Sequence, residues 1–319
     1  MKRALEMELR MQIDRWMIVF GRGARAFAWV LAAWLASCGG GSQIEPFQPR
    51  QIILLGDETV VLVAGGKRYG INGLDANNNI DCSQLPMWSQ QLVGNFGIVL
   101  DLCNPGAATA VRGVTRGAAN AKVADLDAQI AAQLAASDVT SKDLFLVMVG
   151  LNDIIERYEA GAGCGDAELS ARGHLVAAQV NRLVAAGGRV ILSTVHDLGL
   201  TPYAAAKNAV APGQSALLTC LTDTFNARLR VDIVQDGRFI GLVLADDTTK
   251  AMVRNPGAFG LGNVTDAACT VAAPDCTTAT LAAGATTATH LWADDRHFGP
   301  VAHNQLALAA ETRARNNPF

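Results

Sequence analysis

The chain has 319 residues, of which half are hydrophobic and 17% are charged, so it can bury a sizeable core and is not disordered by composition. Its formal net charge is −3. Residues 1–37 carry more basic than acidic residues, and without this segment the rest of the chain has a net charge of about −6. An acidic chain without a stripe of basic and aromatic residues is a poor partner for nucleic acids. A small organic or acyl-ester substrate is the better expectation.

Residues 1–37 have the three parts of a secretory signal peptide. Basic residues are followed by the apolar run 26–35 and then by small residues that lead to Cys38. The apolar run is shorter than the roughly 20 residues needed to cross a bilayer. Either Met1 or Met17 could be the true start. We therefore expect an exported chain.

A lipid anchor is expected at Cys38. The sequence Leu35-Ala36-Ser37-Cys38 resembles the lipobox of bacterial lipoproteins, whose cysteine is acylated and becomes the first mature residue. The alternative is ordinary cleavage beside an incidental cysteine. Residues 38–50 begin with a glycine-rich stretch typical of a flexible tether. The predicted location is the bacterial outer membrane or periplasm, with the membrane as a partner through Cys38.

Residues 51–319 are predicted to form one α/β domain. Apolar runs alternate with amphipathic stretches, which predicts a parallel sheet covered by helices on both faces, a three-layer α/β/α sandwich. The expected strands are residues 52–55, 96–102, 144–149, 189–194 and 238–244. The expected helices are residues 81–94, 118–136, 166–186, 215–234, 246–254 and 300–316. Residues 60–80 are expected to be a lid or binding loop, and 196–212 a second loop.

Six cysteines remain after Cys38, an even number that suits three disulfides in an oxidising compartment. They are Cys82, Cys103, Cys164, Cys220, Cys269 and Cys276. About 15 connectivities are possible for six cysteines, although nearness along the chain suggests Cys82 with Cys103 and Cys269 with Cys276. A metal site is the alternative, but no pair has the Cys-x-x-Cys spacing of a zinc clamp, so a metal is not expected. No cofactor is expected either.

Three polar segments stand at the ends of predicted elements. Gly56-Asp57-Glu58-Thr59 follows the first strand, Gly150-Leu151-Asn152-Asp153 follows the third apolar run, and Asp294-Asp295-Arg296-His297 precedes the last helix. Ligands of open α/β sheets bind at the carboxyl ends of the strands, so these segments are predicted to meet there. Together they resemble the GDSL, or SGNH, family of ester hydrolases, in particular its lipase-like branch. The resemblance implies a flavodoxin-like five-stranded parallel sheet, the SGNH hydrolase fold.

The resemblance also implies a role for each motif. His297 is the expected base, and Asp294, three residues before it, the acid that fixes its tautomer. Gly106 and Asn152 match the oxyanion donors. The supporting residues are Asp57, Gly150 and Asp153. The plainer alternative for Asn152 and Asp153 is that they cap the next helix.

Glu58 occupies the position of the family's serine nucleophile. A carboxylate has no proton for His297 to remove, and its attack on an ester would give an anhydride. The first hypothesis is a hydrolase in which Glu58 and His297 activate water, with lipids, short acyl esters or acetylated glycans as substrates. The second is an envelope lipoprotein that binds a ligand in a catalytically silent site. Thr59 as a substitute nucleophile, and a purely structural lipoprotein, are further alternatives.

Overall fold

The computed structural model describes residues 46–316, and residues 47–316 belong to one compact unit. The predicted signal peptide, Met17, Cys38 and most of the tether lie outside the described residues. Within the described residues, no helix is both long and apolar enough to cross a membrane.

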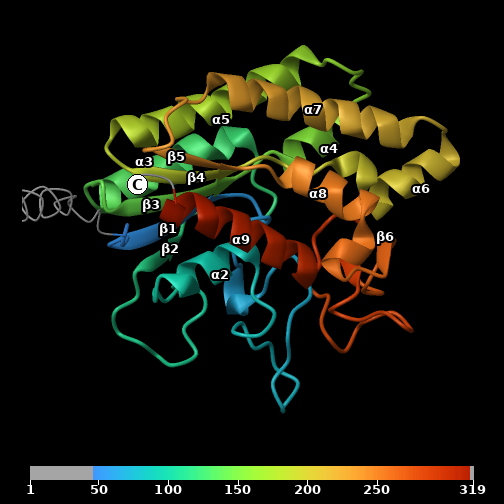
Figure 1. Ribbon diagram of the computed structural model, residues 1–319, viewed down its shortest axis with the longest axis horizontal. Helices are drawn as coiled ribbons and strands as arrows, with labels where there is room; N and C mark the ends of the chain where they lie inside the picture. The colour runs from blue at the N-terminus through green and yellow to red at the C-terminus, as the bar shows by residue number, and fades with distance from the viewer. Residues whose placement is uncertain (1–45, 317–319) are drawn as a thin grey trace, which may run out of the picture. The chain divides into compact units, whose positions relative to one another are not determined.

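A five-stranded parallel sheet forms the centre of the unit, with the strand order β2-β1-β3-β4-β5 (Figure 1). The strands are β1 (Gln51–Gly56), β2 (Gly113–Thr115), β3 (Asp143–Met148), β4 (Arg189–Ser193) and β5 (Ile240–Val243). Successive side chains of β1 point to opposite faces, and both faces are buried. This explains why the strand is a continuous apolar run rather than an alternating one. The predicted three-layer parallel architecture is confirmed.

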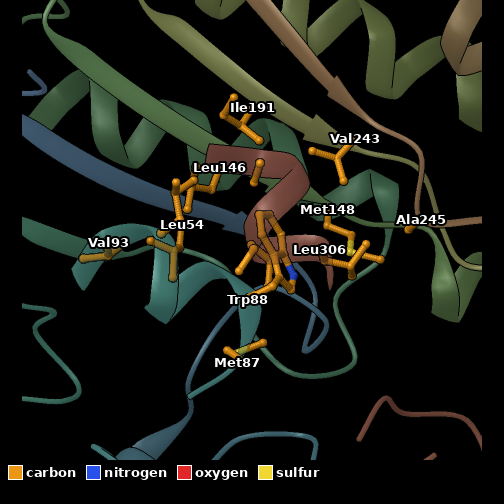
Figure 2. Close-up of a cluster of buried hydrophobic side chains, with 14 of the residues drawn as sticks. Leu54, Met87, Trp88, Val93, Leu146, Met148, Ile191, Val243, Ala245 and Leu306 are labelled. Atoms are coloured by element: carbon orange, nitrogen blue, oxygen red, sulfur yellow. The ribbon is translucent and has the colours of Figure 1, made fainter. Parts of the chain in front are cut away.

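Helices cover both faces of this sheet (Figure 1). The helices are α2 (Trp88–Asn95), α3 (Leu126–Ala136), α4 (Leu151–Glu159), α5 (Ala167–Ala185), α6 (Pro202–Val210), α7 (Gln214–Asp232), α8 (Ala245–Arg254) and α9 (Pro300–Asn316). One apolar core packs α2, α8 and α9 against Leu54, Leu146 and Ile191, and Figure 2 shows Trp88 and Leu306 meeting these strands. The second core packs α3, α4, α5 and α7 against the other face, which carries Ile53 and Val147.

Short elements complete the described part of the chain. They are the 3₁₀ turns η1 (Ala64–Gly66), η2 (Val123–Asp125), η3 (Leu198–Leu200) and η4 (Pro256–Phe259), and a two-stranded parallel pair, β6 (Asn263–Ala267) and β7 (His290–Trp292). Three disulfides join Cys82 to Cys103, Cys164 to Cys220, and Cys269 to Cys276. The two pairings suggested by nearness along the chain are therefore confirmed.

The second strand was predicted at the wrong place in the chain. Residues 96–102 are not a sheet strand, and β2 is formed instead by the short segment Gly113–Thr115. Residues 99–101 do lie beside it, because Gly113 donates to the Val99 carbonyl at 2.8 Å and accepts from Asp101 at 2.9 Å. The side chains of Phe96, Ile98 and Leu100 belong to the core that contains α2, so the hydrophobic run reflects core burial rather than membership of the sheet.

Two further predictions differ from the structure. The helix expected over residues 81–94 begins only at Trp88, because the buried guanidinium of Arg68 holds the carbonyls of Cys82, Gln84 and Leu85 in a turn. The loop expected over 196–212 contains η3 and α6. Thr201 caps α6 by accepting the Ala204 N–H at 3.2 Å, a local signal that the sequence did contain.

Candidate functional site

Asp57 joins the carboxyl ends of β1 and β3. Its carboxylate accepts the backbone N–H groups of Thr59 at 2.9 Å and Gly150 at 3.1 Å, and also the Thr59 hydroxyl. Burial and then the neighbouring charge of Glu58 raise the pKa of Asp57 to about 7. The Thr59 hydroxyl is therefore engaged with Asp57, which removes support for Thr59 as a substitute nucleophile.

Two glycines allow this close junction. Gly56 has φ +125°, and a Cβ there would lie 1.9 Å from the Met148 carbonyl oxygen on β3. Gly150 has φ +126°, and its Cβ would lie 2.5 Å from the Phe225 ring. Both the positive φ and the lack of space require glycine. The supporting position expected of Gly150 thus has a physical basis at the β3–α4 turn.

Glu58 points into a set of hydrogen-bond donors. Its Oε2 accepts the backbone N–H of Asn120 at 2.7 Å and the side-chain amide of Asn152 at 3.0 Å, while the same amide lies 3.1 Å from Oε1. The Glu58 side chain is only 3% exposed. A buried carboxylate is thereby held by two donors from different parts of the chain.

Asn152 is positioned by the start of α4. Its amide also donates to the Ala121 carbonyl at 3.1 Å, so one N–H is anchored and the other faces Glu58. Asp153 accepts the Val123 N–H at 3.0 Å and pairs with Arg172 at 3.0 Å, which fixes the same turn. No side-chain bond caps α4, so capping does not account for Asn152.

Gly106, the other residue predicted as an oxyanion donor, is not brought into this cluster. It lies in an exposed turn along a groove of about 500 Å³ beside α2, whose lining residues do not include Glu58. Asn120 supplies the backbone donor instead. It has φ +60°, a left-handed conformation that asparagine tolerates better than most residues.

His297 lies between two carboxylates. Its Nδ1 is 2.9 Å and 3.0 Å from the two oxygens of Asp294, and its Nε2 is 3.8 Å from Glu58 Oε1. The first contact is a hydrogen bond and the second an ion pair longer than a hydrogen bond. The Nε2 atom is buried and has no hydrogen-bond partner among the described residues. The acid, imidazole and amide expected from the sequence are therefore brought together around residue 58.

The three separate motifs thus converge at the carboxyl edge of a five-stranded parallel sheet, as the resemblance implies. This is the sheet order and the placing of motifs that the resemblance to GDSL-type hydrolases implies.

Comparisons with known proteins give fold-level likenesses. No protein-family model and no curated protein sequence matches this chain. Among solved structures, the chain is similar to Axe2, an acetylxylan esterase from Geobacillus stearothermophilus, with 13% identity and a TM-score of 0.47 over 84% of this chain and 96% of that one. It is also similar to a member of the lipolytic protein G-D-S-L family from Veillonella parvula, with 11% identity and a TM-score of 0.42 over 82% and 95% of the two chains. Likenesses at this level do not assign an activity.

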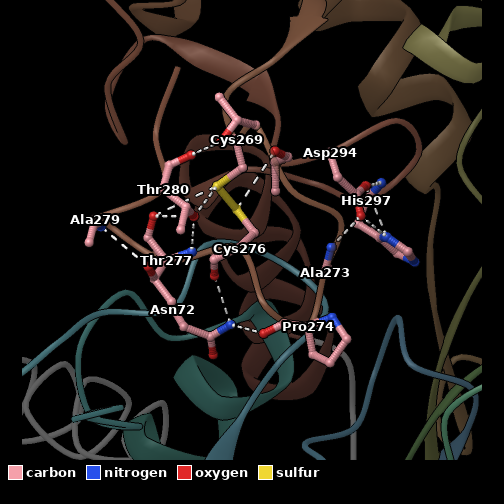
Figure 3. Close-up of a disulfide and its surroundings, with 12 residues drawn as sticks. Asn72, Cys269, Ala273, Pro274, Cys276, Thr277, Ala279, Thr280, Asp294 and His297 are labelled. Carbon is pink, nitrogen blue, oxygen red and sulfur yellow. Dashed lines mark hydrogen bonds and ion pairs between the residues drawn. A yellow bond between two sulfur atoms is a disulfide. The ribbon is translucent and has the colours of Figure 1, made fainter. Parts of the chain in front are cut away.

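The Cys269–Cys276 loop supports the acid of the site (Figure 3). The Ala273 N–H donates to Asp294 Oδ2 at 2.9 Å, while the Asp294 Oδ1 atom accepts the backbone N–H groups of Arg296 and His297. Asn72, from the loop after β1, donates to the carbonyls of Pro274 and Cys276 at 2.9 Å and 3.0 Å. The disulfide loop and the 60–80 loop are therefore joined by hydrogen bonds beside Asp294.

Tyr69 brings the 60–80 loop against the imidazole. Its half-buried ring meets the His297 ring edge-on, with the centroids 5.1 Å apart. Desolvation and then the charge of Glu58 raise the pKa of Tyr69, so its hydroxyl stays protonated at neutral pH. The predicted lid or binding loop thus supplies a wall of the site.

The electrostatics favour a protonated imidazole. Burial alone would lower the pKa of His297, but the contacts with Asp294 and Glu58 outweigh it and raise that pKa to about 9. Burial would raise the pKa of Glu58, but the facing His297 and the donated hydrogen bonds hold it below its ordinary value. The pKa of Asp294 is likewise lowered, since burial is outweighed by its bonds to His297. The three groups therefore form a carboxylate–imidazolium–carboxylate series at neutral pH.

Sequence reasoning missed three contributors, Asn120, Tyr69 and Ala273. Asn120 and Ala273 act through a backbone N–H, and the type of a residue does not indicate such a role. Tyr69 was within the predicted loop 60–80, but its ring contact depends on how that loop folds back. Only the asparagine at a left-handed position gave a local signal, and it was a weak one.

Proposed function

We propose that this chain binds ligands of the carboxylic-ester class on a GDSL-type scaffold and does not turn them over by a serine-hydrolase route. The observation that carries the proposal is the position of the Glu58 carboxylate. It accepts the Asn120 N–H and the Asn152 amide, the two donors that a serine-type mechanism would use for a substrate oxyanion. The residue at the nucleophile position thus occupies the donors that catalysis would need.

The charge state of His297 supports the same conclusion. A triad base must be neutral to take a proton, yet the pKa of His297 is raised to about 9 by its two carboxylate neighbours. At pH 7 only about one molecule in a hundred would carry the neutral imidazole. Glu58, with its lowered pKa, is also a weak base.

The proposal includes a location outside the cytosol, with an anchor on Cys38. Three disulfides within residues 46–316 support an oxidising compartment. The ligand classes that the resemblance suggests are lipid esters, short acyl esters and acetylated glycans. Such a ligand would meet the site beside Tyr69 and His297.

A second candidate is an ester hydrolase that uses activated water. The unpartnered Nε2 of His297, 3.8 Å from Glu58 Oε1, favours it, because a water molecule could bond to both atoms. This route would leave Asn120 and Asn152 engaged with Glu58 and so deprive the ester of its oxyanion donors.

Hydrolysis and binding assays on the purified protein separate these functions. On short p-nitrophenyl esters, the wild type should be no faster than His297→Ala, while calorimetry with an acetylated xylo-oligosaccharide or a lipid ester should show saturable binding. Hydrolysis that depends on His297 would establish the water route and refute the proposal. A folded protein with neither binding nor turnover would leave only a structural envelope role.

A further inference from the structure

Each of the five sheet strands carries a basic residue at its amino end or within two residues of it. In the spatial order from β2 to β5, these residues are Arg112, Arg50, Lys142, Arg189 and Arg238, which we call the basic edge. The strand register places all five within two residues of one level across the sheet. Because neighbouring strands lie about 4.8 Å apart, the row is about 20 Å long.

The basic edge faces solvent. Four of its five residues are exposed, and only Arg189 is half-buried. Basic residues can complement the negative C-terminal ends of helices, but the last turns of α5 and α7 carry Arg182 and Arg230 in that place. The helix ends therefore do not account for a row that follows the strands.

The basic edge is an exception in an acidic molecule. Residues 46–316 hold 20 basic and 25 acidic side chains, a net charge of −5. Three acids accompany the basic edge. Asp143 and Asp236 pair with Arg50 and Arg238 at 2.8 Å and 2.6 Å, and the exposed Asp138 lies beside Arg50. Five basic and three acidic side chains give this surface a charge of +2, so the rest of residues 46–316 has −7.

Two guanidinium groups of the basic edge lie over the same ring. Arg189 and Arg238 are 4.8 Å and 5.6 Å from the centroid of the Phe239 ring. Burial, and then the charge of Arg238, lower the pKa of Arg189. Repulsion between like charges is relieved when an anion lies beside both of them. This end of the row therefore favours an anionic partner.

The compact unit begins at the same edge. Phe47, three residues before Arg50, is buried, and its ring lies 6.3 Å from that of Phe96. Cys38, the proposed site of the lipid anchor, precedes Phe47 by nine residues. Nine residues span at most about 30 Å. An anchor on Cys38 would therefore keep this edge of the sheet close to a membrane.

We propose that the protein lies on a phospholipid bilayer through the basic edge, which contacts the anionic headgroups. The inference rests on the proposed function only for the anchor on Cys38, which selects a bilayer among anionic partners. The anchor raises the local concentration of the domain at the membrane, and the basic edge sets its orientation. Salt screens charges beyond about 8 Å, so the attraction acts only when this edge faces the headgroups.

The expected effect is moderate. Each Lys or Arg beside an anionic bilayer strengthens binding about fivefold. A surface charge of +2 then favours the orientation with the basic edge on the bilayer by about 30-fold. Such a factor would orient an anchored domain but would give only weak binding without the anchor.

This orientation also bears on the ligand. Strand β1, from Gln51 to Gly56, spans about 20 Å. The candidate site lies at its carboxyl end, so it would face away from the bilayer. Among the ligand classes proposed above, acetylated glycans and short acyl esters in the aqueous phase then fit better than lipid esters held in the membrane.

The test measures which lysines of the full purified chain a bilayer covers. Vesicles of phosphatidylcholine are used alone or with about one-third phosphatidylglycerol as the anionic lipid. Amines are acetylated with N-hydroxysuccinimide acetate and located by mass spectrometry. With phosphatidylglycerol at low salt, acetylation of Lys142 should fall by about fivefold or more, and it should recover in about 0.5 M salt. Lys207, on α6, which follows the carboxyl end of β4, is the internal control and should not change.

Two matched variants test the role of the charge. Arg112→Glu brings the charge of the basic edge and its three acids to zero and should abolish the protection of Lys142. Arg254→Glu makes the same change at an exposed residue at the end of α8, and the protection should remain as in the wild type. The wild-type measurement is decisive by itself if a variant fails to fold.

Equal acetylation of Lys142 with and without phosphatidylglycerol at low salt would overturn the inference. Protection that survives in folded Arg112→Glu would overturn it as well. Protection by duplex DNA but not by vesicles would assign the basic edge to a nucleic acid and also contradict the inference. Absence of ligand binding in calorimetry would refute the proposed function by a separate readout, so the two failures are distinguishable.

Discussion

The two sides of His297 are built differently. On one side, Asp294 is three residues away in the chain and is fixed by backbone N–H groups, one of them from the Cys269–Cys276 loop. On the other side, Glu58 comes from the end of β1, is held by donors 62 and 94 residues away, and stands 3.8 Å from the ring. The Asp294 side is a fixed support for the imidazole. The Glu58 side is held by hydrogen bonds from Asn120 and Asn152, the donors that we propose a serine-type site would leave free.

Replacing that occupant should give the largest effect. Glu58→Ser frees the Asn120 and Asn152 donors and restores a hydroxyl beside a histidine that Asp294 already orients. We expect kcat/KM on p-nitrophenyl acetate to rise by about 10³-fold or more over the wild type, given the cost of lacking a triad nucleophile. The gain should vanish in the double variant with His297→Ala. A folded Glu58→Ser protein that stays inert would show that the remaining groups are not assembled.

Neutralising each carboxylate in turn compares the two sides by stability. Asp294→Asn should lower the free energy of unfolding at pH 7 by about 3–5 kcal/mol, because it removes the negative charge in direct contact with a buried imidazolium. Glu58→Gln keeps an acceptor for Asn120 and removes only the longer ion pair, so we expect a loss of about 1–2 kcal/mol. Urea unfolding of both variants checks the order. Equal losses would contradict the difference between the two sides.

The stability of the wild type should also fall at alkaline pH. The folded pKa of His297, about 9, lies above the unfolded value of about 6.5. The stability it contributes is therefore complete below about pH 6.5 and is lost as the pH rises through 9, by about 3 kcal/mol. The pKa of Asp57 is raised to about 7, so its contribution to stability is lost as the pH rises from about 4 to 7. Most of that loss comes before His297 begins to lose its proton. Urea titrations at several pH values should show the decline, and His297→Ala should flatten it.

The disulfide loop gives a smaller and more local effect. Replacing Cys269 and Cys276 by serine releases the Ala273 support of Asp294 and should lower the pKa of His297 by about one unit, because a less firmly positioned carboxylate stabilises the imidazolium less. The matched control replaces Cys164 and Cys220. Their disulfide closes a longer loop of the chain, so its loss should cost more stability and yet leave that pKa unchanged. NMR titration of His297 separates the two outcomes.

The fold was predictable where its signals are local. Helix α9 spans residues 300–316 as expected, and α5 begins after Asp166, whose side chain accepts the Leu169 N–H. β3 was recognisable because both of its faces are buried. β2 was not, because a three-residue edge strand containing glycine has no apolar run of its own.

For the site, the sequence predicted the contributing side chains but not the contributing backbone groups. The positions of Glu58, Asn152, Asp294 and His297 followed from motifs at the ends of strands and before the last helix. A donor was expected at Gly106, whereas the backbone N–H that reaches Glu58 is that of Asn120, which is aimed by the chain reversal after β2, a tertiary feature. The unusual residue at position 58 was visible in the sequence, but its hydrogen bonds from Asn120 and Asn152 required the structure.

NMR titration of the His297 ring, in the wild type and in Glu58→Gln, tests most directly whether the Glu58 carboxylate pairs with a protonated imidazole. The account predicts that the wild-type ring stays protonated at pH 7 and titrates near pH 9, and that its pKa falls in Glu58→Gln because one of the two facing carboxylates is neutralised. A wild-type ring that titrates near its ordinary value of about 6.5 and does not respond to Glu58→Gln would contradict it.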